Sequence, residues 1–346
     1  MGRRGGTAME NGSVSAGYLK SILDYAADKG ASRSALLAAV ELDDAIFEDA
    51  DNRVPMEKFR RMMQLGAEYT NNPAFSLDYC WDMPFVRTSI VGLIAESTAN
   101  MGEALEQLNR YGKLVAEVDI GTAGERFALV PEGHELWLED TRLNPNEFPE
   151  LTESTFGRFI CEFRRHFGDT PFVKRIKVTH ERPAHYKDYD RVLQAPVEFA
   201  ADRNAMEIET SWLTVQTDYA DRYAFGILSK HADALLKELE SSKTIKGRAE
   251  SIMIPVLHTG ELTMDQVAEK MGLSRQSLYR GLKAEGISFE QLRDDLRHKM
   301  ACHYLAEKKV SANETAYLVG FSDPSAFSRA FKRWTGQAPG SWQAVR

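Results

Sequence analysis

One helical pattern occurs twice in this chain, and the repeat constrains the fold more than any other feature. The first copy runs from Thr263 to Gly286 and the second from Ser311 to Gly336. The copies match at these pairs, the last three after one extra residue in the second copy: Ala268 and Ala316, Gly272 and Gly320, Ser274 and Ser322, Leu278 and Phe327, Arg280 and Arg329, Lys283 and Lys332. Such a repeat predicts the same local structure in both places.

Each copy starts and stops its first helix in the same way. Thr263 and Gln266 fit the capping box that satisfies free amides at a helix start. Gly272 then ends the helix, because glycine accepts the left-handed conformation common at helix C-termini. The second copy repeats this pattern from Ser311 to Gly320. A short helix is therefore predicted in each copy.

A second helix follows almost at once. Ser274 and Ser322 are placed to cap it. Two helices joined by a short turn that contains glycine form a helix-turn-helix, whose second helix can enter the major groove of DNA.

Each second helix has an apolar face and a polar face. The apolar residues stand four apart and are predicted to pack inward: Leu278, Leu282, Phe327 and Phe331. The polar face carries Arg275, Gln276, Tyr279 and Arg280 in the first copy, and Ser325, Ser328, Arg329 and Lys332 in the second. Arginine pairs with guanine, glutamine with adenine and serine with several base edges, so these faces predict DNA recognition. A solvated helix face is the alternative for either helix alone, and its repetition with basic residues at the same place disfavours that alternative.

This stretch resembles the DNA-binding domain of AraC/XylS-type transcription regulators, in which a long helix joins two helix-turn-helix motifs. The resemblance rests on Gly272, Leu273, Ser274, Leu278, Arg280, Leu282, Lys283, Gly286, Ser288, Phe289, Arg297, Ala301, Leu305, Glu314, Ala316, Gly320, Phe321, Ser322, Asp323, Ser325, Phe327, Arg329, Phe331, Lys332, Gly336 and Pro339. Three features depart from the family pattern: Gly281 inside a reading helix, Thr315 at an aliphatic position, and Trp342-Gln343 in place of tyrosine-arginine. Gly281 alone would cost about 1 kcal/mol relative to alanine.

The resemblance implies roles for the polar residues. Those expected to read bases are Arg275, Gln276, Tyr279, Arg280, Ser325, Ser328 and Arg329. Lys283, Lys332 and Arg333 would mainly contact phosphates. Ser288 with Gln291 predicts the start of the long helix, over residues 289–308. That helix would separate the reading helices by about 34 Å, one turn of DNA.

The charged residues are distributed unevenly between the N-terminal part of the chain and the part that contains the repeat. The net charge is -8, yet residues 241–346 carry 16 Lys plus Arg against 11 Asp plus Glu, whereas residues 1–240 carry 27 against 40. An acidic sensor joined to a nucleic-acid-binding domain has this asymmetry.

The acidic part predicts an α+β domain in which helices precede strands. Helical spacing covers residues 14–43, 55–69, 73–111 and 151–167, and alternation predicts strands within 126–130, 134–140, 172–181 and 196–210, with a turn at Pro131 to Gly133. This order resembles the arabinose-binding-type domain of some AraC-like regulators. The resemblance is carried by Lys177 to Pro183, Tyr189, Pro196, Val197, Phe199 and Trp212.

The predicted organisation has four parts. They are a disordered extension at 1–13, an α+β effector-binding and dimerisation domain at 14–220, a helical linker at 221–243, and an all-α DNA-binding domain with two helix-turn-helix motifs at 244–346.

Features of other protein classes are missing. Cys80, Cys161 and Cys302 are odd in number and scattered, which fits free thiols in a reducing compartment. No apolar run approaches the roughly eighteen residues that a membrane span needs. The first thirteen residues lack the apolar stretch of a signal peptide. A cytoplasmic protein without membrane contact is expected.

No catalytic, metal or cofactor set is visible, so an enzyme is not expected. Asp294-Asp295 fits a solvated helix face, and Cys302-His303 fits packing within a helix. His180 and His185 have neither metal-ligand nor triad spacing.

Two features of the α+β part leave alternatives open. Phe156, Phe159 and Phe163 share a helix face, which is either core or the wall of an effector pocket. Lys174, Arg175 and Lys177 follow nearby and fit a solvated strand edge or contacts to an anionic effector.

The sequence therefore predicts a cytoplasmic transcription regulator, by resemblance an effector-responsive activator. Its expected partners are double-stranded promoter DNA, a small-molecule effector of unknown class, RNA polymerase and a second copy of the chain. The alternatives are a ligand-independent DNA-binding architectural or interaction protein and, less favoured, an enzyme fused to a DNA-binding domain.

Overall fold

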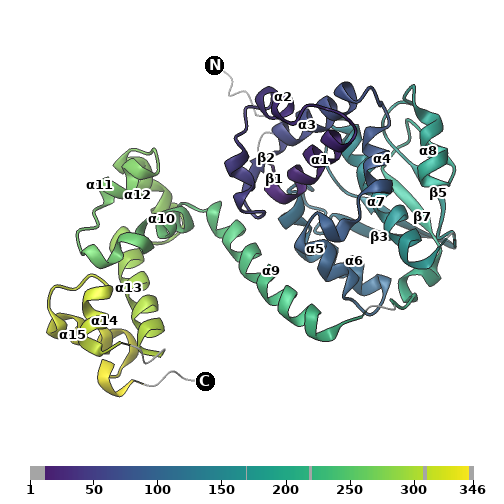
Figure 1. The fold of residues 1–346 in the computed structure, drawn as a ribbon. Helices are drawn as coiled ribbons and strands as arrows, with labels where there is room; N and C mark the ends of the chain where they lie inside the picture. Colours follow the sequence, from purple (N-terminus) through teal and green to yellow (C-terminus); the bar gives the residue numbers. More distant parts are fainter. Residues whose placement is uncertain (1–11, 169, 218–219, 307–309, 343–346) are drawn as a thin grey trace. The chain divides into compact units, whose positions relative to one another are not determined.

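The chain folds into two compact units. The structure, a computed structural model, describes residues 12–168, 170–217, 220–306 and 310–342. The N-terminal unit is Met1–Leu236 and the C-terminal unit is Lys237–Arg346 (Figure 1). The first combines helices with a sheet, and the described residues of the second form helices and turns. The prediction of an α+β domain followed by an all-α domain is confirmed.

The first half of the N-terminal unit is helical. Its elements are α1 (Ala16–Asp28), α2 (Arg33–Ala39), η2 (Asp44–Glu48), α3 (Met56–Tyr69), α4 (Phe75–Asp82), η3 (Phe85–Arg87), α5 (Ile90–Glu96) and α6 (Met101–Val115). Serine or asparagine caps four of these helices, at Ser15, Ser32, Ser89 and Asn100.

A short ribbon precedes α1, where no strand was predicted. Strand β1 (Ser13–Ser15) pairs antiparallel with β2 (Arg53–Pro55). Strands of three residues are too short to show a period in the sequence. Ser13 therefore belongs to the fold, and residues 1–11 of the predicted disordered extension lie outside the described residues.

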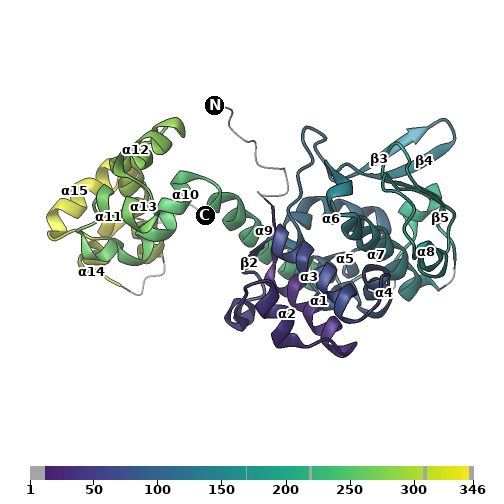
Figure 2. The same ribbon diagram turned by 90° about the horizontal axis from the view of Figure 1, so that it is seen from above.

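The second half of the N-terminal unit is built on a five-stranded sheet. The elements are β3 (Phe127–Glu132), β4 (Glu135–Asp140), η4 (Pro145–Glu147), α7 (Pro149–Phe167), β5 (Val173–Lys177), α8 (Tyr186–Leu193), β6 (Val197–Glu198), β7 (Ala205–Ile208) and η5 (Thr210–Thr214). The strand order is β3-β4-β7-β5-β6, and only the β5–β6 pair is parallel. The β3–β4 hairpin projects from the edge of the sheet (Figure 2).

The hairpin turn lies later than predicted. Glu132 pairs with Glu135, so the turn is Gly133 and His134, and Gly133 has φ +61°. Pro131 belongs to β3, because an edge strand tolerates a residue that lacks an amide donor.

Helix α7 joins the helical half to the sheet. Its Phe159 ring lies 5.1 Å from the ring of Phe127 on β3. On another face Gly157 meets α4, where a Cβ would lie 3.2 Å from the Cβ of Cys80. Glycine at this position allows the two helices to approach closely.

Helix α9 (Arg222–Ser242) leads into the C-terminal unit. The elements that follow are α10 (Ile245–Met253), η6 (Ile254–Thr259), α11 (Met264–Lys270), α12 (Arg275–Ala284), α13 (Phe289–Ala306), α14 (Ala312–Leu318), α15 (Pro324–Thr335) and η7 (Pro339–Ser341). The predicted long helix is α13, and residues 307 and 308 of that prediction lie outside the described residues.

Two hydrophobic cores share α13. Leu292 and Leu296 belong to the core under α10, α11 and α12, whereas Ala301 belongs to the core under α14 and α15. Figure 1 shows α13 running from one helix pair to the other. At about 1.5 Å per residue, its 18 residues make a rigid connection. Among the described residues no helix is both long and apolar enough to span a membrane.

Candidate functional site

The first helix-turn-helix has the predicted caps. Thr263 Oγ1 accepts a hydrogen bond from the Gln266 amide at 3.3 Å, and Gln266 Oε1 accepts one from the Thr263 amide at 3.0 Å. Gly272 follows α11 with φ +67°. Ser274 then caps α12 by accepting from the Ser277 amide at 3.1 Å. Side-chain acceptors therefore satisfy amides at the starts of both helices.

The second helix-turn-helix repeats this arrangement with one correction. Ser311 and Glu314 form the predicted capping box, and Gly320 has φ +79°. The N-cap of α15 is Asp323, whose carboxylate accepts from the amides of residues 325 and 326, each at 3.0 Å. The prediction of Ser322 as the cap was wrong, because Pro324 is favoured as the first helical residue and makes its predecessor the cap.

The turn of the second helix-turn-helix packs on α13 and on η6. Arg297 of α13 donates from Nη2 to the Gly320 carbonyl at 2.9 Å, and its guanidinium lies 4.7 Å from the Phe321 ring centroid. A Cβ on Gly320 would lie 2.2 Å from the carbonyl oxygen of Leu257 in η6. Only glycine allows this turn to pack so closely on the first half of the unit.

Gly281, a departure from the family pattern, has a packing role. A Cβ at this position would lie 2.8 Å from Cγ1 of Ile245 in α10. One helical turn later, Glu285 accepts hydrogen bonds from the amides of Ile245 and Lys246 at 2.8 and 2.9 Å. The same face of α12 thus holds the start of α10, which accounts for a glycine inside this helix.

The other two departures also fill the core. Thr315 is fully buried, and its hydroxyl donates to the Ser311 carbonyl at 2.9 Å. Trp342 packs edge-on against Phe331 at 5.8 Å. Residue 343 lies outside the described residues.

All ten side chains expected to contact DNA are exposed on α12 and α15. They are Arg275, Gln276, Tyr279, Arg280, Lys283, Ser325, Ser328, Arg329, Lys332 and Arg333. The apolar residues between them, Leu278, Leu282, Phe327 and Phe331, are buried. Each helix therefore presents its polar face to solvent, as predicted.

The exposed cations differ in their partners. Arg275 pairs with Asp265 at 2.8 Å and Arg333 pairs with Asp294 at 3.0 Å. Lys283 lies 5.9 Å from the Tyr279 ring. Within the described parts of the chain, no carboxylate lies in ion-pair range of Arg280 or Arg329. These two guanidinium groups need not release a partner to bind DNA.

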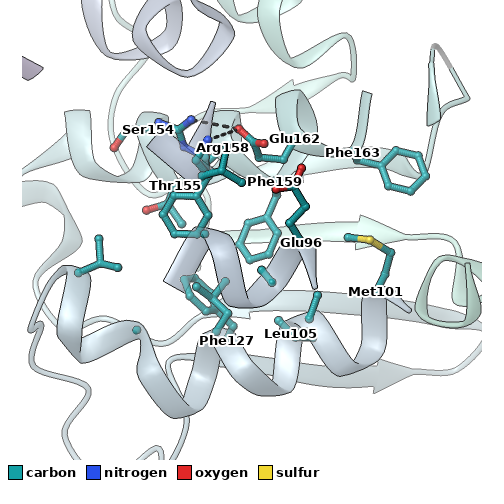
Figure 3. A pocket seen from close by; sticks show the side chains of 18 of the residues that line it. Glu96, Met101, Leu105, Phe127, Ser154, Thr155, Arg158, Phe159, Glu162 and Phe163 are labelled. Atoms are coloured by element: carbon teal, nitrogen blue, oxygen red, sulfur yellow. Dashed lines mark hydrogen bonds and ion pairs between the residues drawn. The ribbon is translucent and has the colours of Figure 1, made fainter. Parts of the chain in front are cut away.

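The N-terminal unit contains a separate pocket of about 160 Å³. Apolar side chains form most of its wall: Phe85, Val86, Met101, Ala104, Leu105, Leu108, Phe127, Phe159, Phe163 and Trp212. Figure 3 shows side chains of α7 on one wall, with Met101 and Leu105 of α6 on the other. A concave, mostly apolar cavity with a few polar groups is typical of a small-molecule site.

The polar groups of the pocket lie mainly on α7 and at Arg126, just before β3. Arg158 is 12% exposed and lies 3.2 Å from Glu162. Arg126 reaches Asp140 at 3.3 Å and donates to Thr155 Oγ1 at 3.2 Å. Glu96 and His166, 3.9 Å apart, are more exposed parts of the same wall.

These positions decide the two questions left open for the phenylalanines of α7 and the cations of β5. Phe159 and Phe163 line the pocket, whereas Phe156 is buried and does not. The cations of β5 do not line the pocket, and they pair with acidic side chains instead: Arg175 with Glu207 and Glu135, and Lys177 with Asp202. Strand β5 pairs with β7 and β6, so these residues lie on a solvated face of the sheet rather than at its edge.

The described residues show neither a reactive thiol nor a metal-binding group. Burial raises the pKa of the Cys80 thiol to about 12 and that of Cys161 to about 11, so both stay protonated. Cys302 packs against the second core of the C-terminal unit, and burial raises its pKa as well. No group of His, Cys, Asp or Glu in the described residues is arranged to hold a metal ion.

His180 and His185 belong to a buried cluster around a carboxylate. Glu153 accepts hydrogen bonds from Tyr189 Oη at 2.5 Å, from His185 Nε2 at 3.0 Å, and from Ser76. His180 contacts the same tyrosine hydroxyl at 3.2 Å. The cluster ties α4, α7 and α8 together.

Two helix-turn-helix motifs with exposed basic second helices, preceded by a pocket-bearing α+β unit, define a DNA-binding transcription regulator. Comparisons with known proteins identify the family. Residues 30–216 match the arabinose-binding domain of AraC transcription regulators, N-terminal, and residues 267–344 match a helix-turn-helix domain. The chain belongs to the AraC family of transcription regulators.

Two relatives and one solved structure match this chain over nearly their whole length. The ornithine utilization regulator of Pseudomonas aeruginosa is 24% identical over 95% of this chain and 96% of its own. The transcriptional regulator VirS of Mycobacterium tuberculosis is 25% identical over 97% of this chain and 98% of its own. The crystal structure of the regulator CdpR from Pseudomonas aeruginosa has 18% identity and a TM-score of 0.43, over 92% of this chain and 95% of that one. All three are named as regulators.

Proposed function

We propose that α12 and α15 read promoter DNA from adjacent major grooves, and that a small molecule in the pocket of the N-terminal unit alters this binding. The observation that carries the proposal is the repeated helix-turn-helix, with a polar basic face exposed on each second helix and α13 fixing the two halves. Residues 14–220 would form the effector-binding and dimerisation domain, 221–243 a helical linker and 244–346 the DNA-binding domain.

Residue roles follow from side-chain chemistry and exposure. Base reading is assigned to Arg275, Gln276, Tyr279, Arg280, Ser325, Ser328 and Arg329. Lys283, Lys332 and Arg333 are assigned to phosphates. The Asp265 and Asp294 ion pairs must open or rearrange when Arg275 and Arg333 bind DNA, so we expect those two arginines to contribute less than Arg280 and Arg329.

The assignment is tested by comparing two substitutions on α15. Arg329→Ala should cost about 1 to 3 kcal/mol of binding and relax sequence preference at one position. Lys332→Ala should weaken all sequences similarly and lower the salt-dependence slope by about one. Lys299→Ala removes the same charge from an exposed site on α13 and serves as the control. Selection of bound sequences from a random DNA pool, followed by titration at several salt concentrations, measures both effects.

The groove assignment is wrong if Arg329→Ala and Lys332→Ala both bind like the Lys299→Ala control. It is also wrong if Arg329→Ala weakens every sequence equally, because that result assigns Arg329 to the backbone.

The remaining parts of the proposal concern regulation. We propose a homodimer that acts in the bacterial cytoplasm as an activator and recruits RNA polymerase, with the small molecule as its signal. Reconstituted transcription with purified polymerase, with and without an added metabolite fraction, tests these parts. Transcription that falls when the protein is added would make it a repressor.

A further inference from the structure

Arg158 has a donor that the fold does not use. Its Nη1 donates to the Met83 carbonyl and to Glu162 Oε1, the latter at 3.2 Å. Its guanidinium also lies 5.1 Å from the Tyr79 ring and 5.6 Å from the Phe85 ring. Among the described residues, no acceptor lies within hydrogen-bonding distance of the buried Nη2. A buried, charged donor without a partner is costly and calls for an explanation.

The surrounding contacts hold this arginine in place. Two aromatic rings and two acceptors fix the plane of the guanidinium, and Arg158 is part of the pocket wall. Figure 3 shows it beside Ser154 and Glu162 at one end of the pocket. Less than 1 Å² of Nη2 is exposed, so a ligand reaches this donor only after a small movement of the pocket wall. A guanidinium with an unpaired N–H then matches the geometry of a carboxylate, which accepts short, charge-assisted hydrogen bonds from arginine.

One oxygen of the nearby carboxylate already accepts several hydrogen bonds. Glu162 Oε1 accepts from the Phe85 amide at 2.8 Å, from Arg158 at 3.2 Å and from Arg165 at 3.1 Å. Thr155 Oγ1 accepts from Arg126 at 3.2 Å, so its own hydroxyl hydrogen remains available to donate. The polar end of the pocket therefore offers donors to a ligand, and an acceptor group on the ligand is required.

The rest of the pocket determines the size and polarity of the part of the ligand that lies away from Arg158. Most of the remaining wall is apolar, with Glu96 and His166 at its more exposed part. The volume of about 160 Å³ compares with the roughly 150 Å³ cavity that holds benzene in another protein. The space suits a short aliphatic chain or a single aromatic ring.

We propose that the effector of this regulator is a small amphipathic monocarboxylic acid, with its carboxylate on Arg158 and its apolar part between α6 and α7. This inference rests on the proposed function, in which the pocket receives a small-molecule signal. It adds the ligand class and the residue that selects it.

The experiment compares acids with their neutral amides on the full chain. Hexanoate, octanoate and phenylacetate are each paired with hexanamide, octanamide and phenylacetamide. Binding is measured as a ligand-dependent rise in the unfolding temperature and by calorimetric titration, because a ligand that binds only the folded form must stabilise it. At least one acid should bind, and its amide should bind about tenfold or more weakly, as expected for a lost charge-assisted hydrogen bond.

Substitutions at Arg158 locate the selectivity. Arg158→Met should remove the preference for acid over amide, and Arg158→Lys should keep part of it because the charge remains. Since Arg158 also packs between rings, Arg158→Met can fail to fold. The variant Gly112→Leu then decides the location.

Gly112 lines the pocket on α6, and a Cβ there meets no atom within 4 Å. Leucine at this position should fill the pocket and abolish acid binding in a folded protein. The matched control is Gly226→Leu on α9, where a Cβ also meets no atom within 4 Å and which does not line the pocket. This control should bind the acid as the parent does.

The outcomes separate the inference from the proposed function. If amides bind as tightly as acids, or if none of the six compounds binds, the inference is overturned, and DNA binding by the unliganded protein still tests the function. Acid binding that survives Gly112→Leu also overturns it. A further outcome is that Gly112→Leu abolishes acid binding, but the acid leaves the DNA affinity and transcription of the parent protein unchanged. This outcome supports the ligand class and refutes the regulatory role of the pocket.

Discussion

Gly281 allows a test of how α12 is held against α10. Substitution by alanine has two opposing effects. Alanine is more favourable than glycine inside a helix by about 1 kcal/mol. Its Cβ, however, would lie 2.8 Å from Cγ1 and 3.1 Å from Cγ2 of Ile245, so the side chain must shift.

The cost of crowding Ile245 decides whether Gly281→Ala stabilises or destabilises α12. Ile245 is β-branched and lies in the first turn of α10, so it has few alternative rotamers. Overpacking of this kind costs about 1 to 3 kcal/mol. Gly281→Ala should therefore destabilise α12 by up to about 2 kcal/mol. The Ile245→Ala background removes the two shortest contacts and keeps only the Cβ of residue 245, at 3.3 Å, so the same substitution should stabilise α12 by up to about 1 kcal/mol.

Hydrogen exchange on the full chain measures this reversal, because it gives opening free energies for individual segments. Protection of the α12 amides is compared for the parent, the two single variants and the double variant. Gly226→Ala on α9, where a Cβ meets no atom within 4 Å, controls for helix propensity alone. If Gly281→Ala raises the protection of α12 equally with and without the Ile245 side chain, the packing argument is refuted.

Three further predictions concern stability. Ser311→Ala removes the cap of α14 and should destabilise the second helix-turn-helix by about 1 kcal/mol, seen as lower exchange protection of α14, and unchanged protection would contradict the cap. Phe327→Ala empties a fully buried site and should cost about 3 to 5 kcal/mol in chemical denaturation, whereas a loss below about 1 kcal/mol would mean that the second core is not packed as described. The hydrogen bond to Glu153 raises the pKa of His185, so this pair should stabilise the N-terminal unit most below pH of about 6.5 and lose that effect as the pH rises through the folded-state pKa. The unfolding temperature should then fall with rising pH less in His185→Gln than in the parent, and equal slopes would exclude the pair as the cause.

The DNA-binding unit was largely predictable because its signals are local. A capping box, a glycine with positive φ and an i, i+4 apolar pair each act within one or two helical turns. The choice of Asp323 over Ser322 as a cap was also local, and Pro324 would have indicated it. The role of Gly281 could not be predicted, since Ile245 lies far away in the sequence and only the folded unit brings them together.

The pocket was less predictable for the same reason. Arg126, Arg158 and Glu96 come from separate elements, and no spacing in the sequence relates them. The aromatic stripe of α7 was ambiguous because this helix is covered on more than one side. Phe159 faces the pocket and β3, whereas Gly157 faces α4.

Gly320 packs closely against the Leu257 carbonyl, and Arg297 donates a hydrogen bond to the Gly320 carbonyl. These contacts have a consequence for the DNA sequence that the protein can bind. Because the turn of the second motif rests on η6, which shares the hydrophobic core of the first motif, the two motifs cannot slide apart to follow altered DNA. The protein should tolerate base changes between its two recognition elements while rejecting the insertion of even one base pair there, since each added pair would rotate one element away from its groove.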